Sequence, residues 1–202
     1  MFKNIKKSIF LFTVELFDSF QIKKSLHEKK RILSQLKKAG IGFKISKDYT
    51  IVNPKYIEVG DNFKCKERVR IEAIDSYNNQ IFTPNIKIGN NVSFNTDIHI
   101  GCIKYIEIGD NCLFASRIYI TDHDHGDTSK EMMLIAPDKR PLISKGSVII
   151  KNNVWVGEGV TILSGVTIGE NSIIATNAVV TKNIPANCVV GGIPAKIIKI
   201  IQ

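Results

Sequence analysis

The stretch IKNNVWVGEGVTILSGVTIGENSIIATNAVVTKNIP, residues 150–185, repeats itself every six residues. The first residue of each hexad is aliphatic, the fifth is small or apolar, and one residue separates the fifth from the next first. Val160, Thr161 and Ile162 therefore point inward, outward and inward, which is the alternation of a short β-strand. The inward positions predicted in this way are Ile150, Val154, Val156, Val160, Ile162, Val166, Ile168, Ser172, Ile174, Ala178, Val180 and Ile184.

Glycine and asparagine fill many of the positions between these strands, where a tight corner needs a permissive backbone. Each hexad is then one short strand and one corner, and coiling such units stacks each strand on the turn below. The pattern also recurs upstream, from about Ile57. We therefore predict an all-β fold, a parallel β-helix of hexapeptide repeats over residues 51–202 that ends in a short C-terminal tail.

Three interruptions break the register of the hexads. Seventeen residues separate Ile71 from Ile88, eight separate Ile100 from Ile108, and thirty separate Ile120 from Ile150. In solenoids such insertions gather where function lies, because the stacked rungs are rigid and the loops carry chemistry. The longest insertion is expected to leave the coil as an extruded loop over about residues 122–141.

Length and cysteine usage agree with one intracellular domain. The chain has 202 residues and 44% hydrophobic content, which is enough for a sizeable core. The four cysteines show no metal-ligand or disulfide spacing, and Cys65 and Cys112 fall on inward positions. We expect reduced thiols and a cytoplasmic protein.

The N-terminal segment carries the whole excess of positive charge. Residues 1–47 hold twelve Lys and Arg against three acidic residues, while the rest of the chain has sixteen of each sign. Apolar residues are spaced there for one face of a helix, at Ile5, Ile9, Phe12, Leu16 and Phe20. We predict a basic amphipathic helical segment over residues 1–50.

Three roles are open for this helix. It could cap the end of the coil, since solenoids need covered ends. It could bind an anionic membrane, which would place the protein at the inner face of the membrane. Nucleic-acid binding is disfavoured, because there is no recognition motif and the aromatic residues follow the aliphatic stripe. A signal peptide is not expected either, since Glu15 interrupts the apolar run and no cleavage site follows.

The longest insertion begins with the histidine-rich sequence ITDHDHGD, residues 120–127. His123 and His125 are two apart on an extended backbone and so face the same side. A neighbouring carboxylate, such as Asp122, could hold one imidazole in a defined tautomer as a base. A turn that caps its own backbone and a zinc site that adds His99 are the alternatives. No separated histidine follows the loop, so we expect no metal.

These motifs together resemble a known family. The hexads, the TDHDHG loop start and the stretch NNVWVGEGVTILSGVTIGENSIIATNAVVTKNIPANCVVGGIPAKIIK are similar to the hexapeptide-repeat acyltransferases. The likeness is to the galactoside, maltose and nodulation acetyltransferase branch and to the O-acetyltransferases of surface polysaccharides. It implies a left-handed coil, although parallel crossovers are usually right-handed. It also implies a homotrimer with active sites between subunits.

The resemblance further assigns roles to single residues. It implies acetyl-coenzyme A as acyl donor and His123 as catalytic base, with His125 and Asp122 as supporting groups or alternative bases. The arm of the donor would run along corners near Trp155, an outward tryptophan, and Gly157, whose corner amides would also hold the oxyanion. The other donor-binding residues that it implies are Glu158, Ala175, Thr176, Thr181, Lys182, Lys196 and Lys199. Ser93 or Asn95 would bind the acceptor.

The expected function is therefore O-acetylation of a sugar hydroxyl in capsule, lipopolysaccharide or another glycan. One alternative is N-acetylation of a nucleotide-linked amino sugar, which the same base could catalyse. A second alternative is a β-helix outside the acyltransferases, either a zinc-dependent hydratase of the carbonic anhydrase type or a non-catalytic scaffold.

Overall fold

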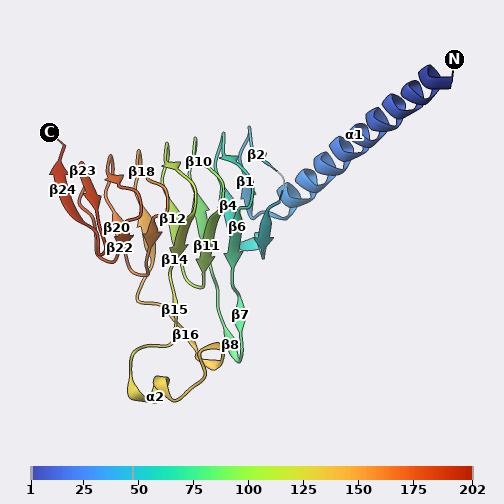
Figure 1. Cartoon of the computed structure of the whole chain (residues 1–202). Coiled ribbons are helices and arrows are strands. Elements are labelled where there is room, and N and C mark those ends of the chain that lie inside the picture. The colour runs from blue at the N-terminus through green and yellow to red at the C-terminus, as the bar shows by residue number, and fades with distance from the viewer. Residues whose placement is uncertain (1, 47, 202) are drawn as a thin grey trace. The chain divides into compact units, whose positions relative to one another are not determined.

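The computed structural model describes residues 2–46 and 48–201, except for the side chains of residues 2–13, 15, 18, 21, 22 and 25. The chain divides into two compact units, Met1–Gln35 and Leu36–Gln202. The first unit is a helix and the second is a coil of stacked β-strands. Figure 1 shows successive rungs of the coil following one another in chain order.

In the described part of the second unit, most strands belong to three sheets of six, eight and six strands. The first sheet contains β1 (Lys38–Ala39), β4 (Ile57–Val59), β9 (Ile86–Ile88), β12 (Ile106–Ile108), β17 (Val148–Ile150) and β20 (Thr167–Ile168). The second sheet contains β2 (Lys44–Ile45), β5 (Lys64–Cys65), β10 (Ser93–Phe94), β13 (Leu113–Phe114), β18 (Trp155–Val156), β21 (Ile173–Ile174), β23 (Cys188–Gly191) and β24 (Lys196–Ile200). The third sheet contains β3 (Thr50–Val52), β6 (Arg70–Ala73), β11 (Ile98–Cys102), β14 (Ile118–Thr121), β19 (Thr161–Ile162) and β22 (Val179–Val180).

Each rung contributes one strand to each sheet in turn, so neighbouring strands of a sheet run parallel. The predicted parallel β-helix is therefore confirmed. The final pair, β23 and β24, is antiparallel. We call the turn from the first to the second sheet the Asn corner, the turn from the second to the third the middle corner, and the turn from the third sheet to the next rung the loop corner.

The interior of the coil is filled by the residues that the period predicts. All the inward positions expected between Ile150 and Ile184 are at most 6% exposed. At the other end of the coil an aromatic column continues this core. Successive rings of this column are in tilted or edge-to-face contact, with centroids 4.9–5.5 Å apart, and belong to Phe43, Phe63, Phe94 and Phe114. All four cysteines are buried and free.

Asparagine side chains bind successive rungs together at the Asn corner. Asn62, Asn91 and Asn111 adopt positive φ, a conformation that asparagine tolerates better than most residues. Their carboxamides form a ladder, since Asn62 donates to Asn91 and Asn91 donates to Asn111, each over 3.0 Å. Each corner thus gains both a permitted backbone conformation and a side-chain link to the next rung.

The coil begins before the expected boundary at residue 50. The backbone of residues 36–46 and 48–52 belongs to the first rung, because Gly40, Lys44 and Thr50 each donate an N–H over 2.8 Å to a carbonyl of the next rung. Phe43 continues the aromatic column there. The six-residue period does extend into this rung, since Ala39, Ile45 and Ile51 are in register with Val59, Cys65 and Ile71, so the expected boundary lay too far along the chain.

The segment before the coil is the helix α1 (Phe2–Gln35). The side chains of Ile5, Ile9 and Phe12, from the predicted apolar stripe, lie outside the described residues. Leu16 and Phe20, the rest of that stripe, are 55% and 62% exposed. Among the described residues, no helix contains a stretch long and apolar enough to cross a membrane.

The Asn ladder predicts a measurable contribution to stability. Replacing Asn91 by Ala removes two hydrogen bonds of the carboxamide ladder and leaves an alanine at φ 55°, a left-handed backbone conformation. Left-handed backbone costs such a residue about 1–2 kcal/mol. We expect the thermal unfolding midpoint to fall by several degrees, at about 2–4 °C per kcal/mol for a chain of this length.

Asn91→Gly is the matched control for this experiment. It also loses the ladder bonds but accepts positive φ without strain. Its midpoint should therefore fall less than that of Asn91→Ala. An equal fall for both variants would show that the backbone conformation is not what asparagine provides.

Candidate active site

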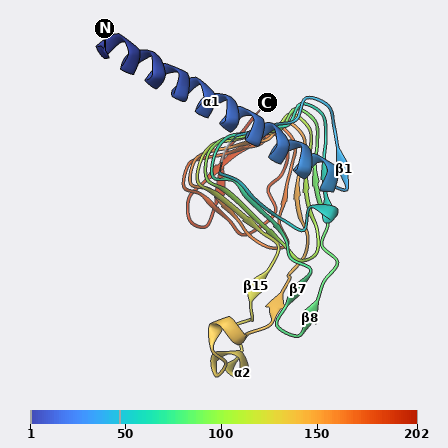
Figure 2. The same cartoon turned by 90° about the vertical axis from the view of Figure 1, so that its right-hand side faces the viewer.

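All three interruptions of the hexad register emerge from the loop corner. Residues 74–85 carry the hairpin of β7 (Ser76–Tyr77) and β8 (Gln80–Ile81), and residues 103–105 form a short turn. Residues 122–147 form the extruded loop, with β15 (Asp124–His125), α2 (Lys130–Met133), the 3-10 turn Pro137–Lys139 and β16 (Leu142–Ile143). The loop therefore extends past the expected residue 141. In Figure 2 the hairpin and the loop project from the same corner.

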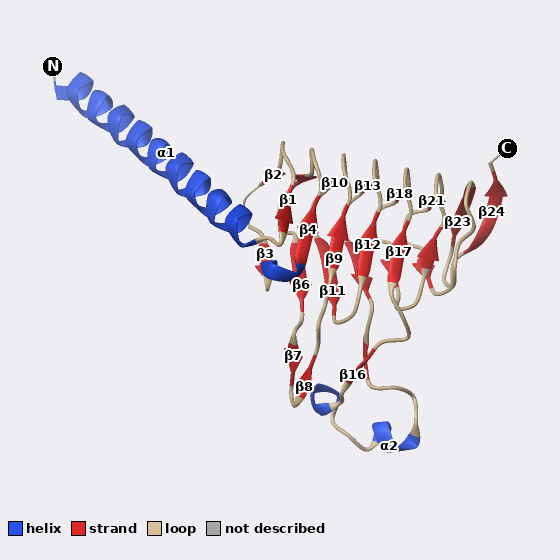
Figure 3. Cartoon of the chain, turned by 180° about the vertical axis from the view of Figure 1, so that it is seen from behind, coloured by secondary structure: helices blue, strands red, loops and turns tan. Residues whose placement is uncertain are grey.

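The hairpin and the extruded loop are joined by hydrogen bonds. The side-chain amide of Gln80 donates to the carbonyl of Leu142 over 3.2 Å and its oxygen accepts the Leu142 N–H over 2.7 Å. The hydroxyl of Tyr77 donates to the carbonyl of Asp138 over 2.7 Å. Figure 3 shows the two insertions projecting together from the coil, with α2 at the end of the loop. The loop is thus fixed beside the hairpin.

His123 lies at the base of the loop and is only 8% exposed. Its Nδ1 is 3.1 Å from Oδ1 of Asp122, and its backbone N–H and carbonyl both bind the hydroxyl of Thr121. The ring lies over Gly101, where an added Cβ would be 3.2 Å from Cε1 of His123. A residue without a side chain at position 101 therefore gives the imidazole its space.

Asp122 holds His123 in place from inside the coil. Its buried carboxylate accepts backbone N–H groups of Ile103, Lys104 and Tyr105 at 2.8–2.9 Å. Its own carbonyl accepts the hydroxyl of Ser164 over 2.7 Å. The side chain is thus turned inward and serves as a support for His123. This position does not suit the alternative role of a base.

The protonation state of Asp122 fixes the tautomer of His123. Burial by itself raises the pKa of the Asp122 carboxyl, but the hydrogen bonds from His123 and from backbone amides outweigh it and lower the pKa below its usual value. A carboxylate can only accept hydrogen bonds, so Nδ1 of His123 carries the hydrogen. Nε2 then has the free lone pair that a general base needs.

His125 faces the same hollow but has a different partner. Its Nδ1 is 3.3 Å from the hydroxyl of Tyr77, which already donates to Asp138 and can therefore accept a hydrogen from the imidazole. The edge of the His125 ring also packs on Tyr77, with centroids 5.3 Å apart. A neutral phenol orients this histidine, whereas a carboxylate orients His123.

A hollow of about 220 Å³ lies in front of the two histidines. Its lining comes from the third sheet, the hairpin and the loop. The lining residues are Arg70, Glu72, Ile74, Tyr77, His99, Gly101, Tyr119, His123, His125 and Leu142. Sequence reasoning missed Arg70, Glu72 and Tyr77, because only the stacking of rungs brings them to His123.

The residues expected to bind the acceptor lie elsewhere in the chain's own coil. Ser93 is in β10 of the second sheet, and Asn95 follows it at the middle corner. Neither lines the hollow in front of His123. Within a single chain they are therefore apart from His123, and their role in binding the acceptor stays a prediction. His99, on the third sheet, is the polar residue of their rung that reaches the hollow.

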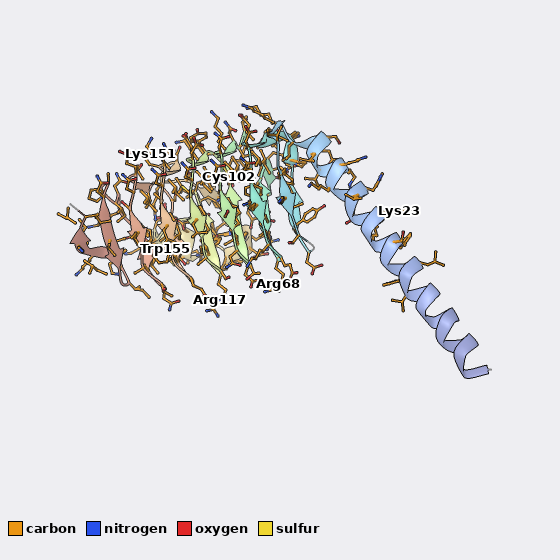
Figure 4. All side chains as sticks on the ribbon, turned by 90° about the horizontal axis from the view of Figure 1, so that it is seen from above. Lys23, Arg68, Cys102, Arg117, Lys151 and Trp155 are labelled. Carbon is orange, nitrogen blue, oxygen red and sulfur yellow. The ribbon has the colours of Figure 1, made fainter. Side chains whose placement is uncertain are left out.

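The residues expected to bind the donor divide between two corners and the end of the coil. Gly157 stacks on Ala175 and Thr176 at the middle corner, where a Cβ on Gly157 would be 2.8 Å from the Thr176 nitrogen. The Gly157 N–H donates to Ile174, so it is not free for an oxyanion. Glu158 pairs there with Arg117 over 2.6 Å, and Figure 4 shows Arg117 projecting from the same edge as Arg68.

The remaining donor residues lie apart from this group. Thr181 and Lys182 follow β22 at the loop corner, and Lys196 and Lys199 are exposed in β24. Trp155 is 50% exposed in β18, so the predicted outward orientation of the tryptophan is confirmed. In one chain the third sheet separates the middle-corner residues from those at the loop corner.

The zinc alternative finds no support among the described side chains. No group of three or more His, Cys, Asp or Glu in residues 2–46 and 48–201, where described, could hold a metal ion. His99, the suggested third ligand, instead places Nε2 2.9 Å from Glu72.

The geometry at Asp122 predicts a pH-dependent contribution to stability. The folded-state pKa is lower than the value of about 3.9 in an unfolded chain, so the carboxylate stabilises the fold above that pH. The contribution is lost as the pH falls through the folded-state pKa. In Asp122→Asn, the carboxamide N–H₂ group would face backbone N–H groups that now donate to the carboxylate, and two donors cannot form a hydrogen bond with each other.

We therefore expect Asp122→Asn to lower the thermal unfolding midpoint at pH 7 and to differ less from the parent below about pH 4. Thermal denaturation followed by circular dichroism across this range checks the prediction. Asp124→Asn, at an exposed ion pair with Lys145, is the control and should change the midpoint little. If the difference in unfolding midpoint between Asp122→Asn and the parent did not change with pH, the stabilising role of the Asp122 carboxylate would be contradicted.

Comparison with known proteins places this geometry in a family. The family model "Bacterial transferase hexapeptide (six repeats)" matches residues 147–182. A protein of Escherichia coli strain K12, named as the lipopolysaccharide biosynthesis O-acetyl transferase WbbJ, is 39% identical over 153 residues. The match covers 74% of this chain and 74% of that protein.

Solved structures with the same fold are more distant in sequence. AntD, an N-acyltransferase from Bacillus cereus, matches with a TM-score of 0.70 at 21% identity, over 88% of this chain and 89% of that chain. A maltose O-acetyltransferase from Clostridium difficile 630 matches with a TM-score of 0.57 at 24% identity, over 86% and 74%. They share the left-handed parallel β-helix, as the motifs predicted. Together with the relative in Escherichia coli, they show that the chain belongs to the hexapeptide-repeat acyltransferases.

Proposed function

We propose that this protein transfers an acetyl group from acetyl-coenzyme A to a sugar hydroxyl during the biosynthesis of lipopolysaccharide, capsule or another surface glycan. The observation that carries the proposal is His123, whose Nδ1 is held by the buried carboxylate of Asp122 and whose Nε2 is left free beside a polar hollow. The relative that is 39% identical supports it, since its name assigns O-acetyl transfer in lipopolysaccharide biosynthesis.

His123 performs the proton transfers in the proposed reaction. Nε2 accepts the proton of the acceptor hydroxyl as that oxygen attacks the thioester carbonyl carbon. The tetrahedral intermediate then collapses, the carbon–sulfur bond breaks, and the proton passes from Nε2 to the leaving thiolate. The products are the sugar ester and free coenzyme A, and no covalent enzyme intermediate is required.

The acyl donor would find suitable groups at the middle corner and in β24 at the C-terminal end of the coil. Ala175 is half-buried and Thr176 is exposed at the middle corner, and Lys196 and Lys199 offer exposed cations for phosphates. The solved structures of AntD include complexes with coenzyme A. Because the third sheet separates the middle corner from His123, a neighbouring copy would have to bring its own middle corner to the hollow. This supports a homotrimer with sites between subunits, for which sedimentation equilibrium would give three chain masses.

The catalytic assignment predicts the effect of removing His123. General-base catalysis is worth about 10²–10⁴-fold, so His123→Ala should lose that much in kcat while binding of acetyl-coenzyme A is retained. The measurement is thiol release from acetyl-coenzyme A against a panel of sugars and nucleotide-linked amino sugars. His125→Ala is the matched control and should lose less than about tenfold, since Tyr77 and not a carboxylate orients it.

Either of two results would contradict the assignment of His123 as the general base. One is thiol release by His123→Ala at the parental rate. The other is a loss in His125→Ala as large as the loss in His123→Ala. Exclusive use of the nucleotide-linked amino sugars would favour the N-acetyltransferase alternative.

We also propose that the protein works at the inner face of the cytoplasmic membrane, held there by α1. Residues of an α-helix turn by about 100° each, so Leu16, Phe17 and Phe20 share one face. Further along, the same face carries the exposed basic residues Lys23, Lys24, His27, Lys30 and Arg31. An exposed apolar patch continued by cations suits a bilayer with anionic headgroups.

Vesicle binding tests the role of this face. The full chain should co-sediment with vesicles that contain phosphatidylglycerol, and added salt should weaken binding. The double substitution Phe17→Ser and Phe20→Ser should weaken it by at least about tenfold, because each Phe buried in the interface contributes roughly 1.5–3 kcal/mol.

Ile81→Ser, at an exposed isoleucine of the hairpin, is the control and should bind like the parent. Equal binding of the parent to neutral phosphatidylcholine vesicles, or full binding by the double variant, would contradict the membrane role. In that case capping of the coil would be the better account of the helix.

A further inference from the structure

Arg70, Glu72 and His99 form a hydrogen-bonded network in the wall of the hollow, and the proposed reaction does not use these side chains. The carboxylate of Glu72 accepts two hydrogen bonds from Arg70: Nε donates to Oε2 and Nη2 donates to Oε1, each over 2.8 Å. Oε2 also accepts Nε2 of His99 over 2.9 Å. The Glu72 side chain is 16% exposed, whereas that of Arg70 is 56% exposed. The carboxylate therefore faces the hollow from a position that neighbouring side chains hold firmly.

The register of the third sheet places Glu72 next to His123. Glu72 of β6 pairs with Gly101 of β11, and Gly101 pairs with Thr121 of β14. Adjacent strands are about 4.8 Å apart, so Glu72 lies one strand spacing from the glycine that the His123 ring covers. The free Nε2 of His123 and the Glu72 carboxylate thus face one small space above Gly101.

Glu72 has room for one more hydrogen bond. Burial alone raises the pKa of its carboxyl, but the bonds from Arg70 and His99 outweigh this and hold the pKa below its usual value, so the group is a carboxylate at neutral pH. A carboxylate offers about four acceptor sites. Arg70 and His99 occupy three of them, which leaves one on Oε1.

We propose that Glu72 determines acceptor specificity by accepting a hydrogen bond from a second hydroxyl, adjacent on the sugar ring to the one that His123 deprotonates. The acceptor is then a sugar with vicinal hydroxyls in the hollow. This inference rests on the proposed function. The hollow of about 220 Å³ is below the roughly 300–1,000 Å³ of pockets for drug-sized ligands, which fits a single sugar unit.

The carboxylate also disfavours an amine as the attacking group. An ammonium bound next to Glu72 is stabilised in its charged form, because an opposite charge within about 4–6 Å favours ionisation. A protonated amine has no lone pair for attack on the thioester. The same wall that binds a diol therefore selects O-acetylation over N-acetylation.

The test compares a diol with its deoxy analogue. The probe is whichever of the methyl glycosides of galactose, glucose and mannose releases thiol fastest, together with its monodeoxy analogues. Glu72→Gln should raise the KM for the parent glycoside at least about tenfold, since a hydrogen bond to a charged group is lost. The KM for acetyl-coenzyme A should not change, and Glu170→Gln, at an exposed site on the Asn corner, should behave like the parent.

The deoxy analogue decides whether Glu72 acts on the neighbouring hydroxyl. On the analogue that lacks this hydroxyl, the parent enzyme and Glu72→Gln should have the same KM within about twofold. A tenfold loss on that analogue as well, or no loss on the diol, would overturn the inference. Should Glu72→Gln fail to fold, Glu72→Asp keeps the charge but withdraws the carboxylate, and the same comparison applies to it.

Binding to an inactive enzyme separates this inference from the proposed function. Saturation-transfer NMR measures the same glycosides on His123→Ala, with and without Glu72→Gln. Glucoside or galactoside binding that depends on Glu72, without thiol release by the parent enzyme, would support the diol site and refute the transferase. Thiol release that is unaffected by Glu72→Gln would leave the transferase and refute the diol site.

Discussion

The backbone hydrogen bonds between rungs are the constraint on which the rest of the molecule depends. Each strand pairs in register with the strand one rung below, so residues at equal positions form columns at a spacing of about 4.8 Å. Glu72, Gly101 and Thr121 are far apart in sequence but neighbours in one column. Insertions at the loop corner leave these columns intact because they occur between strands. The coil can therefore add chemistry at one corner without losing its packing.

The sequence reveals most of the coil and only part of the site. The inward positions between Ile150 and Ile184 could be predicted because small and aliphatic residues recur there at a fixed period and are all buried. His123 could be found because it stands where the period stops. Glu72 could not be found, since an outward glutamate on a strand looks like any solvated residue. Only the stacking, shifted by the hairpin between β6 and β9, brings it below Gly101.

The start of the coil shows a limit of the prediction. Ala39, Ile45 and Ile51 already follow the six-residue period in register with the next rung, but the basic composition up to residue 47 assigned this stretch to the N-terminal segment. Ser93 and Asn95 were predicted to bind the acceptor from the resemblance to the family. Ser93 belongs to the second sheet, while the hollow of the same chain opens on the third.

The two carboxylates nearest to His123 differ in how many of their acceptor sites the fold already uses. Asp122 already accepts hydrogen bonds from three backbone N–H groups, from Nδ1 of His123 and from the thiol of Cys102, so it can only orient the imidazole. Glu72 has three sites occupied and one directed to the hollow. A saturated carboxylate stabilises structure, whereas an unsaturated one needs a donor from a ligand. This difference, set by the backbone on one side and by Arg70 and His99 on the other, divides support from recognition within a single small site.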